Sequence, residues 1–315
     1  MSAPARELAI FGPTAAGKSA LAHAAALALG GEIVVADPFQ RYRGLEIAAD
    51  SPRPGVRAQV PYHLVGDLDL HEASSAGSFA RLAHAAVDGA LGRGRTPIVA
   101  GGTGLYLRAA LGELEFPREV DRSVREEVEA LVARDPGAAL AELARRDPAA
   151  AARIDARNPR RVSRALELAR AGAPRRADRL WSPGTRHPTL LVGVTRPVEV
   201  LDRMIAARVR RELDEGLEAE LEAAIDRPGG LSREAAQIIG VAEVRAIRAG
   251  GMEHEALEPA LAARTRRLAR KQLTWLRRTP GVTGLDLGED PADAALPALL
   301  ALWDRAARPP RGPID

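Results

Sequence analysis

Residues 7–29 read ELAIFGPTAAGKSALAHAAALAL, and this stretch decides the fold. An apolar run is followed by a glycine-bounded loop and then by an alanine-rich segment, which predicts a short strand, a turn and a helix. The loop fits the pattern G-x-x-x-x-G-K-[ST] at every fixed position, with Gly12, Gly17, Lys18 and Ser19. Because a strand precedes the loop and a helix follows it, we interpret it as a P-loop and not as a chance match in a chain rich in glycine and alanine.

The P-loop interpretation predicts a phosphate or diphosphate site. Glycines let the backbone N–H groups of the loop point inward, and the following helix adds its positive N-terminal end. Lys18 would place a compact charge on the outer phosphate, and the Ser19 hydroxyl would ligate a Mg²⁺ ion that shares the phosphate oxygens. The predicted diphosphate-binding or nucleotide-binding residues are Gly12, Pro13, Thr14, Ala15, Ala16, Gly17, Lys18 and Ser19.

The composition predicts a soluble globular protein. With 315 residues, 46% of them hydrophobic, the chain can bury a large core in one elaborated domain or two. No apolar run approaches the roughly 18 residues needed to span a bilayer, and the N-terminal segment lacks the layout of a signal peptide, so we expect a cytoplasmic protein with no membrane segment. The absence of cysteine excludes disulfides and thiolate metal sites.

The basic residues are almost all arginine. Among the 45 lysines and arginines, only Lys18 and Lys271 are lysine. A compact ammonium retained at just two positions indicates that it matters there, since arginine otherwise supplies the positive surface. For Lys271 sequence drift is the alternative interpretation.

Two further strands direct polar residues to the same edge of a sheet. Residues 32–36 (EIVVA) read as a buried strand followed by Asp37, and residues 96–100 (TPIVA) read as another, followed by GGTG with Thr103. Ligands of open α/β sheets bind at the carboxyl ends of the strands, where we expect both side chains. A turn or a helix cap remains the alternative for Asp37. No acidic residue follows Ala100 to hold Mg²⁺, which makes nucleotide hydrolysis a weaker interpretation.

The middle of the chain is predicted to be wholly helical. Between Arg145 and Arg179 there are eleven arginines and four acidic residues, which fits either a phosphate-backbone contact or a solvated helix face. A strand at residues 189–195 (TLLVGVT) makes this segment an insertion in the sheet domain. Long helices are expected at 198–225, 232–249 and 255–278, then a strand at 281–287 and a helix at 296–307.

These elements predict an α/β fold in which a P-loop parallel sheet core is flanked by helices and carries an all-helical insertion domain. We place the catalytic core at residues 1–120 and 187–308, the insertion at 121–186 and a loose tail at 309–315.

Five motifs together resemble the bacterial tRNA dimethylallyltransferases, also called tRNA isopentenyltransferases. They are GPTAAGKS at 12–19, ADPFQRYRG at 36–44, PYHLVG at 61–66, GGTGLYLRAAL at 101–111 and RRLARKQLTWLRR at 266–278. Their order and spacing agree with the family from about residue 8 to residue 286. The chain departs from the common pattern at Pro38, at Arg160 and at the GVAE run of 240–243, where the family has serine, glutamine and GYKE.

The resemblance implies transfer of a dimethylallyl group from dimethylallyl diphosphate to N6 of the adenine just 3′ of the anticodon, with Mg²⁺ assistance. Asp37 would be the general base, and Thr103 would lie beside the reacting groups. The tRNA anticodon stem-loop would be the macromolecular partner, with no obligate protein partner. The implied tRNA-binding residues are Asp37, Pro38, Phe39, Gln40, Thr103, Arg125, Arg160, Arg161, Val162, Ser163 and Arg164.

The residues favour this chemistry independently of the resemblance. An adenine N6 is a weak nucleophile, so its alkylation needs a base and a stabilised leaving group, which Asp37 and the P-loop supply. The alternative is a P-loop kinase that transfers phosphate from ATP to a small metabolite. A non-catalytic RNA-binding protein with a vestigial P-loop and an enzyme of free adenine nucleotides are the other possibilities. The basic insertion favours tRNA over free nucleotides.

Overall fold

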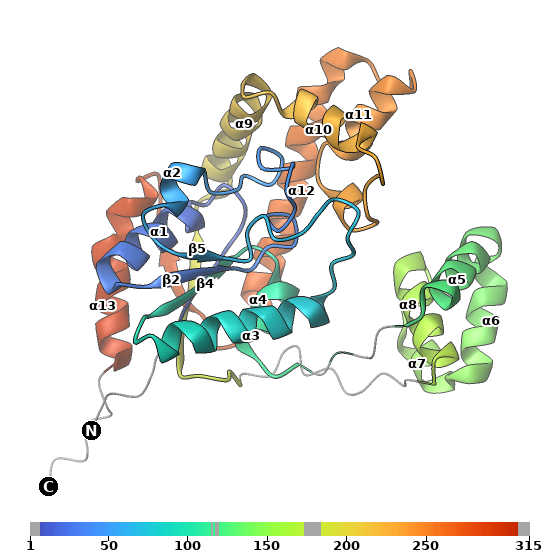
Figure 1. Ribbon diagram of the computed structural model, residues 1–315, viewed down its shortest axis with the longest axis horizontal. Helices are drawn as coiled ribbons and strands as arrows, with labels where there is room; N and C mark the ends of the chain where they lie inside the picture. The colour runs from blue at the N-terminus through green and yellow to red at the C-terminus, as the bar shows by residue number, and fades with distance from the viewer. Residues whose placement is uncertain (1–6, 115, 117–119, 173–183, 308–315) are drawn as a thin grey trace, which may run out of the picture. The chain divides into compact units, whose positions relative to one another are not determined.

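The computed structural model describes residues 7–114, 116, 120–172 and 184–307 (Figure 1). By its contacts the chain divides into two compact units, Met1–Glu113 with Leu180–Asp315, here called the core unit, and Leu114–Arg179, here called the helical unit. The insertion expected at 121–186 overlaps the helical unit. The helical unit both begins and ends seven residues earlier in the chain than expected, at Leu114 and at Arg179. The expected tail at 309–315 and residues 173–183 of the arginine-rich segment lie outside the described residues.

A six-stranded parallel sheet forms the centre of the core unit, in the order β3-β2-β4-β1-β5-β6. This order confirms the predicted parallel α/β sheet. The strands are β1 (Glu7–Phe11), β2 (Glu32–Val35), β3 (Tyr62–His63), β4 (Pro97–Gly101), β5 (Thr189–Thr195) and β6 (Thr283–Asp286). Strands β1, β2 and β4, each followed by one of the predicted functional segments, are neighbours, so their carboxyl ends meet at one edge.

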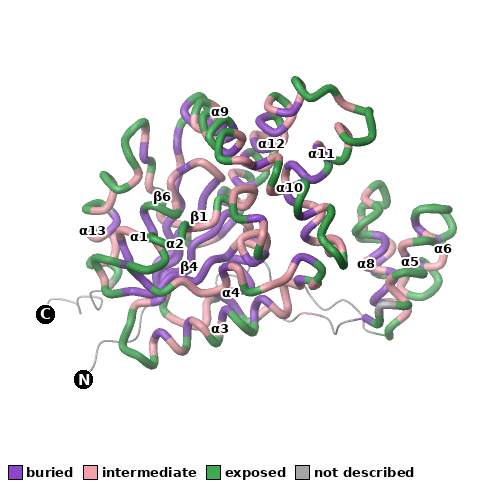
Figure 2. The backbone as a smooth tube through the Cα atoms, turned by 45° about the horizontal axis from the view of Figure 1, so that its top comes forward, coloured by how far each residue is buried: buried purple, intermediate pink, exposed green. Residues whose placement is uncertain are grey.

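Helices cover both faces of this sheet. Those of the core unit are α1 (Lys18–Leu29), α2 (Pro54–Arg57), α3 (Ala76–Gly92), α4 (Gly104–Leu111), α9 (Val198–Asp214), α10 (Leu217–Asp226), α11 (Val241–Arg248), α12 (Leu257–Arg278) and α13 (Leu296–Ala307). Apolar side chains of α1 and α13 pack on one face in a cluster that includes Leu8 and Val192, while α3 and α4 pack against β4. Burial is therefore continuous along the central strands (Figure 2).

The helical unit has its own small core. Its helices are α5 (Arg122–Arg134), α6 (Pro136–Arg146), α7 (Pro148–Arg153) and α8 (Pro159–Arg170). Asp135, Asp147 and Asn158 each accept a hydrogen bond from a backbone N–H of the helix that they begin, and a proline follows each of them at the first helical position. Each Asp-Pro or Asn-Pro break in the sequence is therefore a helix start.

Two of the predicted long helices are wrong because glycines interrupt them. The helix expected at 198–225 ends at Asp214, and α10 begins after Gly216, whose φ is 96°. The helix expected at 232–249 is a 3₁₀ turn (Ala235–Gln237) followed by α11, and Gly240 between them has a φ of 109°. A positive φ is incompatible with a continuous right-handed helix, so the chain turns at both positions. Among the helices of the described residues, none combines the length and apolar character needed to cross a bilayer.

Candidate active site

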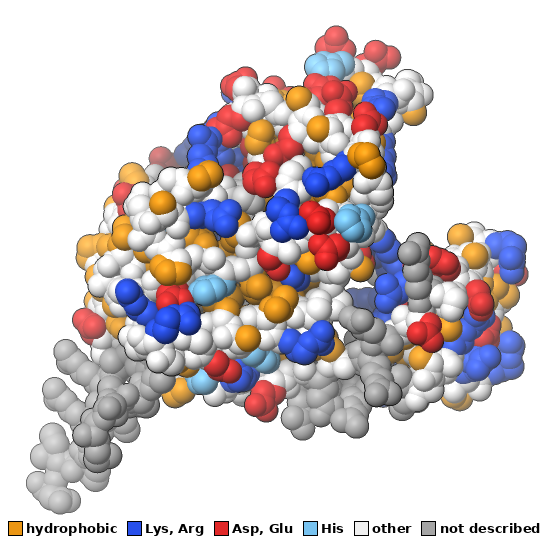
Figure 3. Space-filling model, viewed as in Figure 1, with side chains coloured by type: hydrophobic (Ala, Val, Ile, Leu, Met, Phe, Trp, Pro, Cys, Tyr) orange, Lys and Arg blue, Asp and Glu red, His pale blue; other side chains and the backbone are white. Residues whose placement is uncertain are grey.

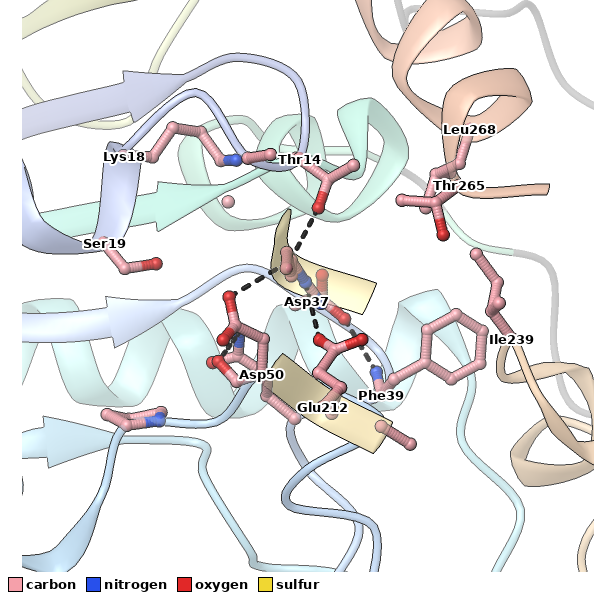
Figure 4. Close-up of a pocket in the computed structure, with 18 of the residues that line it drawn as sticks. Thr14, Lys18, Ser19, Asp37, Phe39, Asp50, Glu212, Ile239, Thr265 and Leu268 are labelled. Atoms are coloured by element: carbon pink, nitrogen blue, oxygen red, sulfur yellow. Dashed lines mark hydrogen bonds and ion pairs between the residues drawn. The ribbon is translucent and has the colours of Figure 1, made fainter. Parts of the chain in front are cut away.

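A cavity of about 670 Å³ lies at the carboxyl ends of β1, β2 and β4. Its wall combines the P-loop, the ends of β2 and β4, and residues of α9 and α12 (Figure 4). This volume is in the range of cavities that hold small-molecule ligands. The predicted residues Thr14, Lys18, Ser19 and Asp37 all line it, so the structure brings the P-loop and the carboxylate after β2 to one space.

The P-loop backbone curls as a phosphate-binding loop requires. Ala15 and Gly17 both have positive φ, 62° and 94°, which turns the chain back on itself before α1. Lys18 Nζ donates to the carbonyl oxygen of Pro13 at 2.7 Å, across the loop. A Cβ at Gly12 would lie 2.4 Å from the carbonyl oxygen of Val194, so only glycine lets the loop start this close to β5.

Asp37 and Lys18 are both partly buried and line the same cavity. The Phe39 backbone N–H donates to Asp37 Oδ1 at 2.9 Å. Burial raises the pKa of Asp37, an effect that the Phe39 N–H and the charge of Lys18 only partly oppose. Burial also lowers the pKa of Lys18 to about 8, which the Asp37 charge partly offsets. Asp37 is therefore a better proton acceptor than an exposed carboxylate, and Lys18 lacks an anion strong enough to offset its desolvation.

A second cation, Arg208, contacts the P-loop. Arg208 of α9 donates from Nη1 to Thr14 Oγ1 at 2.8 Å, and the same atom lies 3.0 Å from Asp50 Oδ2. Its Nε donates to Glu212 Oε1 at 2.6 Å, one helical turn along. Arg208 could not be assigned to the site from the sequence, because an Arg-x-x-x-Glu spacing is common on solvated helices and nothing local connects α9 to the P-loop.

Helix α12 packs directly on the loops after β1 and β4. Gln272 Oε1 accepts the Thr14 backbone N–H at 2.7 Å. A Cβ at Gly102 would lie 2.3 Å from Gln272 Nε2, and one at Gly104 would lie 2.2 Å from Trp275 Cε3. The glycines of GGTG therefore make room for α12, and Gln272 was a second residue that sequence reasoning did not assign to the site.

Thr103 occupies the N-cap position of α4, directly after Gly102, which lines the cavity. Thr103 itself is not among the described residues that form the cavity wall. The strand end before it is fixed closely, because a Cβ at Gly101 would lie 2.2 Å from the carbonyl oxygen of Ala36. Thr103 is thus adjacent to the cavity that Asp37 and Lys18 line.

A buried arginine fixes the loop that carries Asp37, Phe39 and Gln40. Arg41 is 2% exposed and donates from Nη2 to Asp67 Oδ2 at 2.6 Å and from Nη1 to Ser74 Oγ at 3.2 Å. The Leu68 N–H donates to the carbonyl oxygen of Arg41 at 2.9 Å. The ion pair and the backbone bond together hold this loop against residues 66–74.

In the helical unit, the predicted stretch 160–164 has two kinds of residue. Arg160 and Arg161 are exposed, and Arg164 lies 2.9 Å from Glu167 Oε2. Val162 and Ser163 are 3% and 5% exposed and pack inside the helical unit. In this stretch only the arginine side chains are therefore accessible to a partner molecule. Arg125 of α5 is partly buried.

The cavity offers oxygen atoms of the kind that magnesium binds. The Ser19 hydroxyl is exposed at the start of α1, and Asp37 and Asp50 also line the wall. The described residues contain no group of three or more His, Cys, Asp or Glu that could hold a metal ion. This donor set fits Mg²⁺ bound mainly through substrate phosphates and water, its usual mode.

The chain is similar to known proteins over most of its length. The family model described as IPP transferase matches residues 40–279. A tRNA dimethylallyltransferase of Salinispora tropica is 44% identical over 280 residues, which cover 88% of this chain and 87% of the relative. One of Anaeromyxobacter dehalogenans is 42% identical over 292 residues, 91% of this chain and 96% of the relative. The crystal structure of the tRNA isopentenylpyrophosphate transferase of Bacillus halodurans has a TM-score of 0.72 at 31% identity and covers 96% of both chains.

Proposed function

Because this chain belongs to the IPP transferase family, we propose that it transfers a dimethylallyl group from dimethylallyl diphosphate to N6 of the adenine 3′-adjacent to the anticodon in tRNA, releasing pyrophosphate. The relatives' names supply the transferred group and the acceptor. The observation that carries the proposal is the cavity in which a P-loop, a partly buried carboxylate and two cations meet. A leaving diphosphate and a proton acceptor are what this alkyl transfer requires.

We assign the diphosphate to the P-loop, Lys18 and Arg208. Loop N–H groups and the start of α1 favour an anion, and the two cations approach from different elements. As the bond between the dimethylallyl carbon and its oxygen breaks, its electron pair stays on the pyrophosphate, whose growing charge these groups stabilise. The depressed pKa of Lys18 fits this role, because a bound diphosphate would supply the missing countercharge.

We assign the role of base to Asp37. The adenine N6 forms the new bond to carbon and loses a proton, which the Asp37 carboxylate accepts. The bond from the Phe39 N–H holds this carboxylate in place, and burial raises its pKa. An adenine in an RNA loop must leave its stack to reach the cavity, and loop bases do so at low cost. Thr103, beside Gly102, would contact the reacting groups.

We propose Mg²⁺ as the divalent ion, with the Ser19 hydroxyl as its protein ligand. When bound, the ion would neutralise charge on the diphosphate oxygens and so improve the leaving group. An RNA-alkylating enzyme needs no dedicated protein cage for this, since substrate phosphates and water complete the coordination.

We propose that the helical unit binds tRNA through exposed arginines of α8, with Arg125 of α5 as a further contact. Arg160 and Arg161 are exposed in the first turn of α8. Changing Arg161 to Gln should weaken tRNA binding and lower its salt dependence by about one unit of the log–log slope. The exposed Arg134 of α5, changed to Gln, is the matched control. Equal affinity of both variants at two salt concentrations would reassign Arg161 to solvated surface.

The decisive experiment is incubation of the protein with dimethylallyl diphosphate, Mg²⁺ and unmodified tRNA. We expect mass spectrometry to find one added five-carbon unit on the adenine 3′ of the anticodon, with one pyrophosphate released per transfer. An active-site variant, Asp37→Asn, is the negative control. ATP consumption with a small acceptor, and no prenylated RNA, would favour the kinase instead.

A further inference from the structure

One arginine of the core unit is buried against the P-loop and is not among the described residues that form the cavity wall. Arg196 follows β5 directly and is 5% exposed. Its Nε donates to the carbonyl oxygen of Ala16 at 3.0 Å, and its Nη1 donates to the carbonyl oxygen of Gly288 at 2.9 Å. Arg196 therefore joins the P-loop to the residues that follow β6, here called the 287–292 segment.

The surroundings of Arg196 differ from those of the surface cations. Basic and acidic side chains lie side by side over much of the core unit's face drawn in Figure 3. Within the part of the chain that the structure describes, Arg196 is bound by two carbonyl oxygens and by no carboxylate. Burial lowers the pKa of Arg196, and the charges of Asp286 and Asp290 only partly oppose this effect. A buried cation without a contacting anion costs stability, and an anion bound at the P-loop would lessen that cost.

The bond from Arg196 fixes the direction of one P-loop peptide. Ala16 is fully buried, and Gly17 lines the cavity. The peptide between them is trans, so its carbonyl and its N–H point to opposite sides of the loop. Because the Ala16 carbonyl accepts from Arg196, the Gly17 N–H points away from Arg196. A cationic donor on the carbonyl also polarises the peptide and makes its N–H a stronger donor.

The 287–292 segment packs against the same end of the P-loop. Its Leu287 N–H donates to the carbonyl oxygen of Thr195 at 3.0 Å, which places the segment beside Arg196. A Cβ at Gly17 would lie 2.5 Å from the Cβ of Ala292, the first residue of a 3₁₀ turn that leads into α13. Helix α13 in turn lies beside α1, the helix that the P-loop begins (Figure 1). The loop is thus held from the side opposite to α12.

We propose that Arg196 is a positioning residue for the diphosphate, because it holds the Ala16–Gly17 peptide with its N–H directed at the phosphate oxygens and adds a positive charge behind the loop. The inference rests on the proposed function for the identity of this ligand, the diphosphate of the donor. Unlike Lys18 and Arg208, Arg196 would act through the loop and not by touching the ligand. The alternative is that Arg196 only attaches the 287–292 segment and contributes to stability alone.

The test separates diphosphate binding from stability. Arg196→Met removes the charge and both hydrogen bonds. Arg203→Met is the charge-matched control, because Arg203 Nη2 donates to Glu289 of the same segment at 2.8 Å and both of these side chains are exposed. Leu299→Ala is the stability control, because Leu299 of α13 is fully buried in the cluster that covers the sheet. Calorimetric titration with pyrophosphate and Mg²⁺ measures binding without RNA, and steady-state kinetics give the KM of each substrate.

We expect Arg196→Met to bind pyrophosphate about tenfold more weakly, the factor that corresponds to one hydrogen bond from a charged group. Its KM for dimethylallyl diphosphate should rise by a similar factor, while its KM for tRNA stays that of the wild type. Both controls should bind pyrophosphate within about twofold of the wild type, although Leu299→Ala unfolds at a lower urea concentration. A loss of stability alone would not raise the KM of one substrate and spare the other.

Arg196→Lys tests the inference even if Arg196→Met does not fold, which circular dichroism checks. Lysine keeps the charge and can donate to one of the two carbonyl oxygens, but it lacks the planar fork that reaches both. We expect its affinity for pyrophosphate to lie between those of Arg196→Met and the wild type, about threefold below the latter. Its KM for tRNA should again be unchanged.

Three results would overturn the inference. The first is an Arg196→Met variant, or an Arg196→Lys variant if the former does not fold, whose pyrophosphate affinity and donor KM equal those of Arg203→Met. The second is an equal loss of pyrophosphate binding in Leu299→Ala, which would assign the effect to general stability. The third is a wild-type protein that does not bind pyrophosphate. A wild type that binds pyrophosphate and leaves tRNA unmodified would refute the proposed function, whereas the pyrophosphate affinities of the variants would still decide the role of Arg196.

Discussion

Replacing Lys18 by Met should change how the stability of the protein depends on pH. In the folded protein burial lowers the pKa of Lys18 from its ordinary value of 10.5 to about 8. Between these two values the unfolded chain binds more protons than the folded one, so stability rises with pH across this window. Below it both states are protonated, and the folded protein carries the full cost of a poorly solvated ammonium.

The expected magnitude follows from the two pKa values. Between about pH 7.5 and about pH 9.5, proton linkage gives the wild type a gain in unfolding free energy of up to about 2 kcal/mol from Lys18 alone. Few other groups interfere, because the only other lysine, Lys271, is exposed. Burial raises the pKa of Tyr42 and of Tyr62 to about 12, so these tyrosines affect stability only above this window.

The assay is urea unfolding of the wild type and of Lys18→Met at both pH values. We expect the wild type to gain stability and the variant to stay nearly flat, because Met has no proton to lose. The difference between the two slopes is the informative quantity, since the variant also loses the bond to the Pro13 carbonyl, worth about 1 kcal/mol at either pH. Pyrophosphate should stabilise the wild type more than the variant, which keeps the loop N–H groups and Arg208 but lacks the ammonium. Parallel pH profiles would refute the desolvated ammonium.

Three further outcomes are expected. Asp37→Asn should reduce dimethylallyl transfer by about 10²- to 10⁴-fold in single-turnover assays while tRNA affinity stays within a few-fold, and near-normal turnover would remove Asp37 from the role of base. Gly104→Ala should lower the unfolding free energy by about 1–3 kcal/mol in urea, because its Cβ would lie 2.2 Å from Trp275, whereas Gly92→Ala, with nothing within 4 Å, should stay within about 1 kcal/mol of the wild type. Arg41→Met should cost about 2–3 kcal/mol, because it leaves a carboxylate without its buried partner; an unchanged urea midpoint would show that this ion pair contributes nothing.

Much of the fold could be read from the order of residues. The P-loop and the strands at 32–35 and 97–101 were predicted within a residue or two, because a buried parallel strand is a short apolar run that ends at a turn. Helix boundaries were less predictable. Gly216 and Gly240 directly precede new helices and interrupt the expected ones through positive φ, but glycine is also tolerated inside helices, so composition could not decide.

The candidate site shows the same division. Lys18, Ser19 and Asp37 were predictable, because a P-loop is one contiguous backbone segment and because the end of a parallel strand is a fixed place relative to its neighbours. Arg208 and Gln272 were not, since each reaches Thr14 from a distant helix and resembles any polar residue on an amphipathic surface.

The sequence alone determined a glycine-bounded loop with the P-loop pattern, a buried strand that ends in a carboxylate, and the family, whereas the strand order that brings the two together came from the structure. The first three depend on local backbone geometry and on the period of apolar residues. Only the tertiary structure decided which charges meet in the cavity and how water is kept from Lys18 and Asp37, because desolvation and ion pairing arise where separate elements pack.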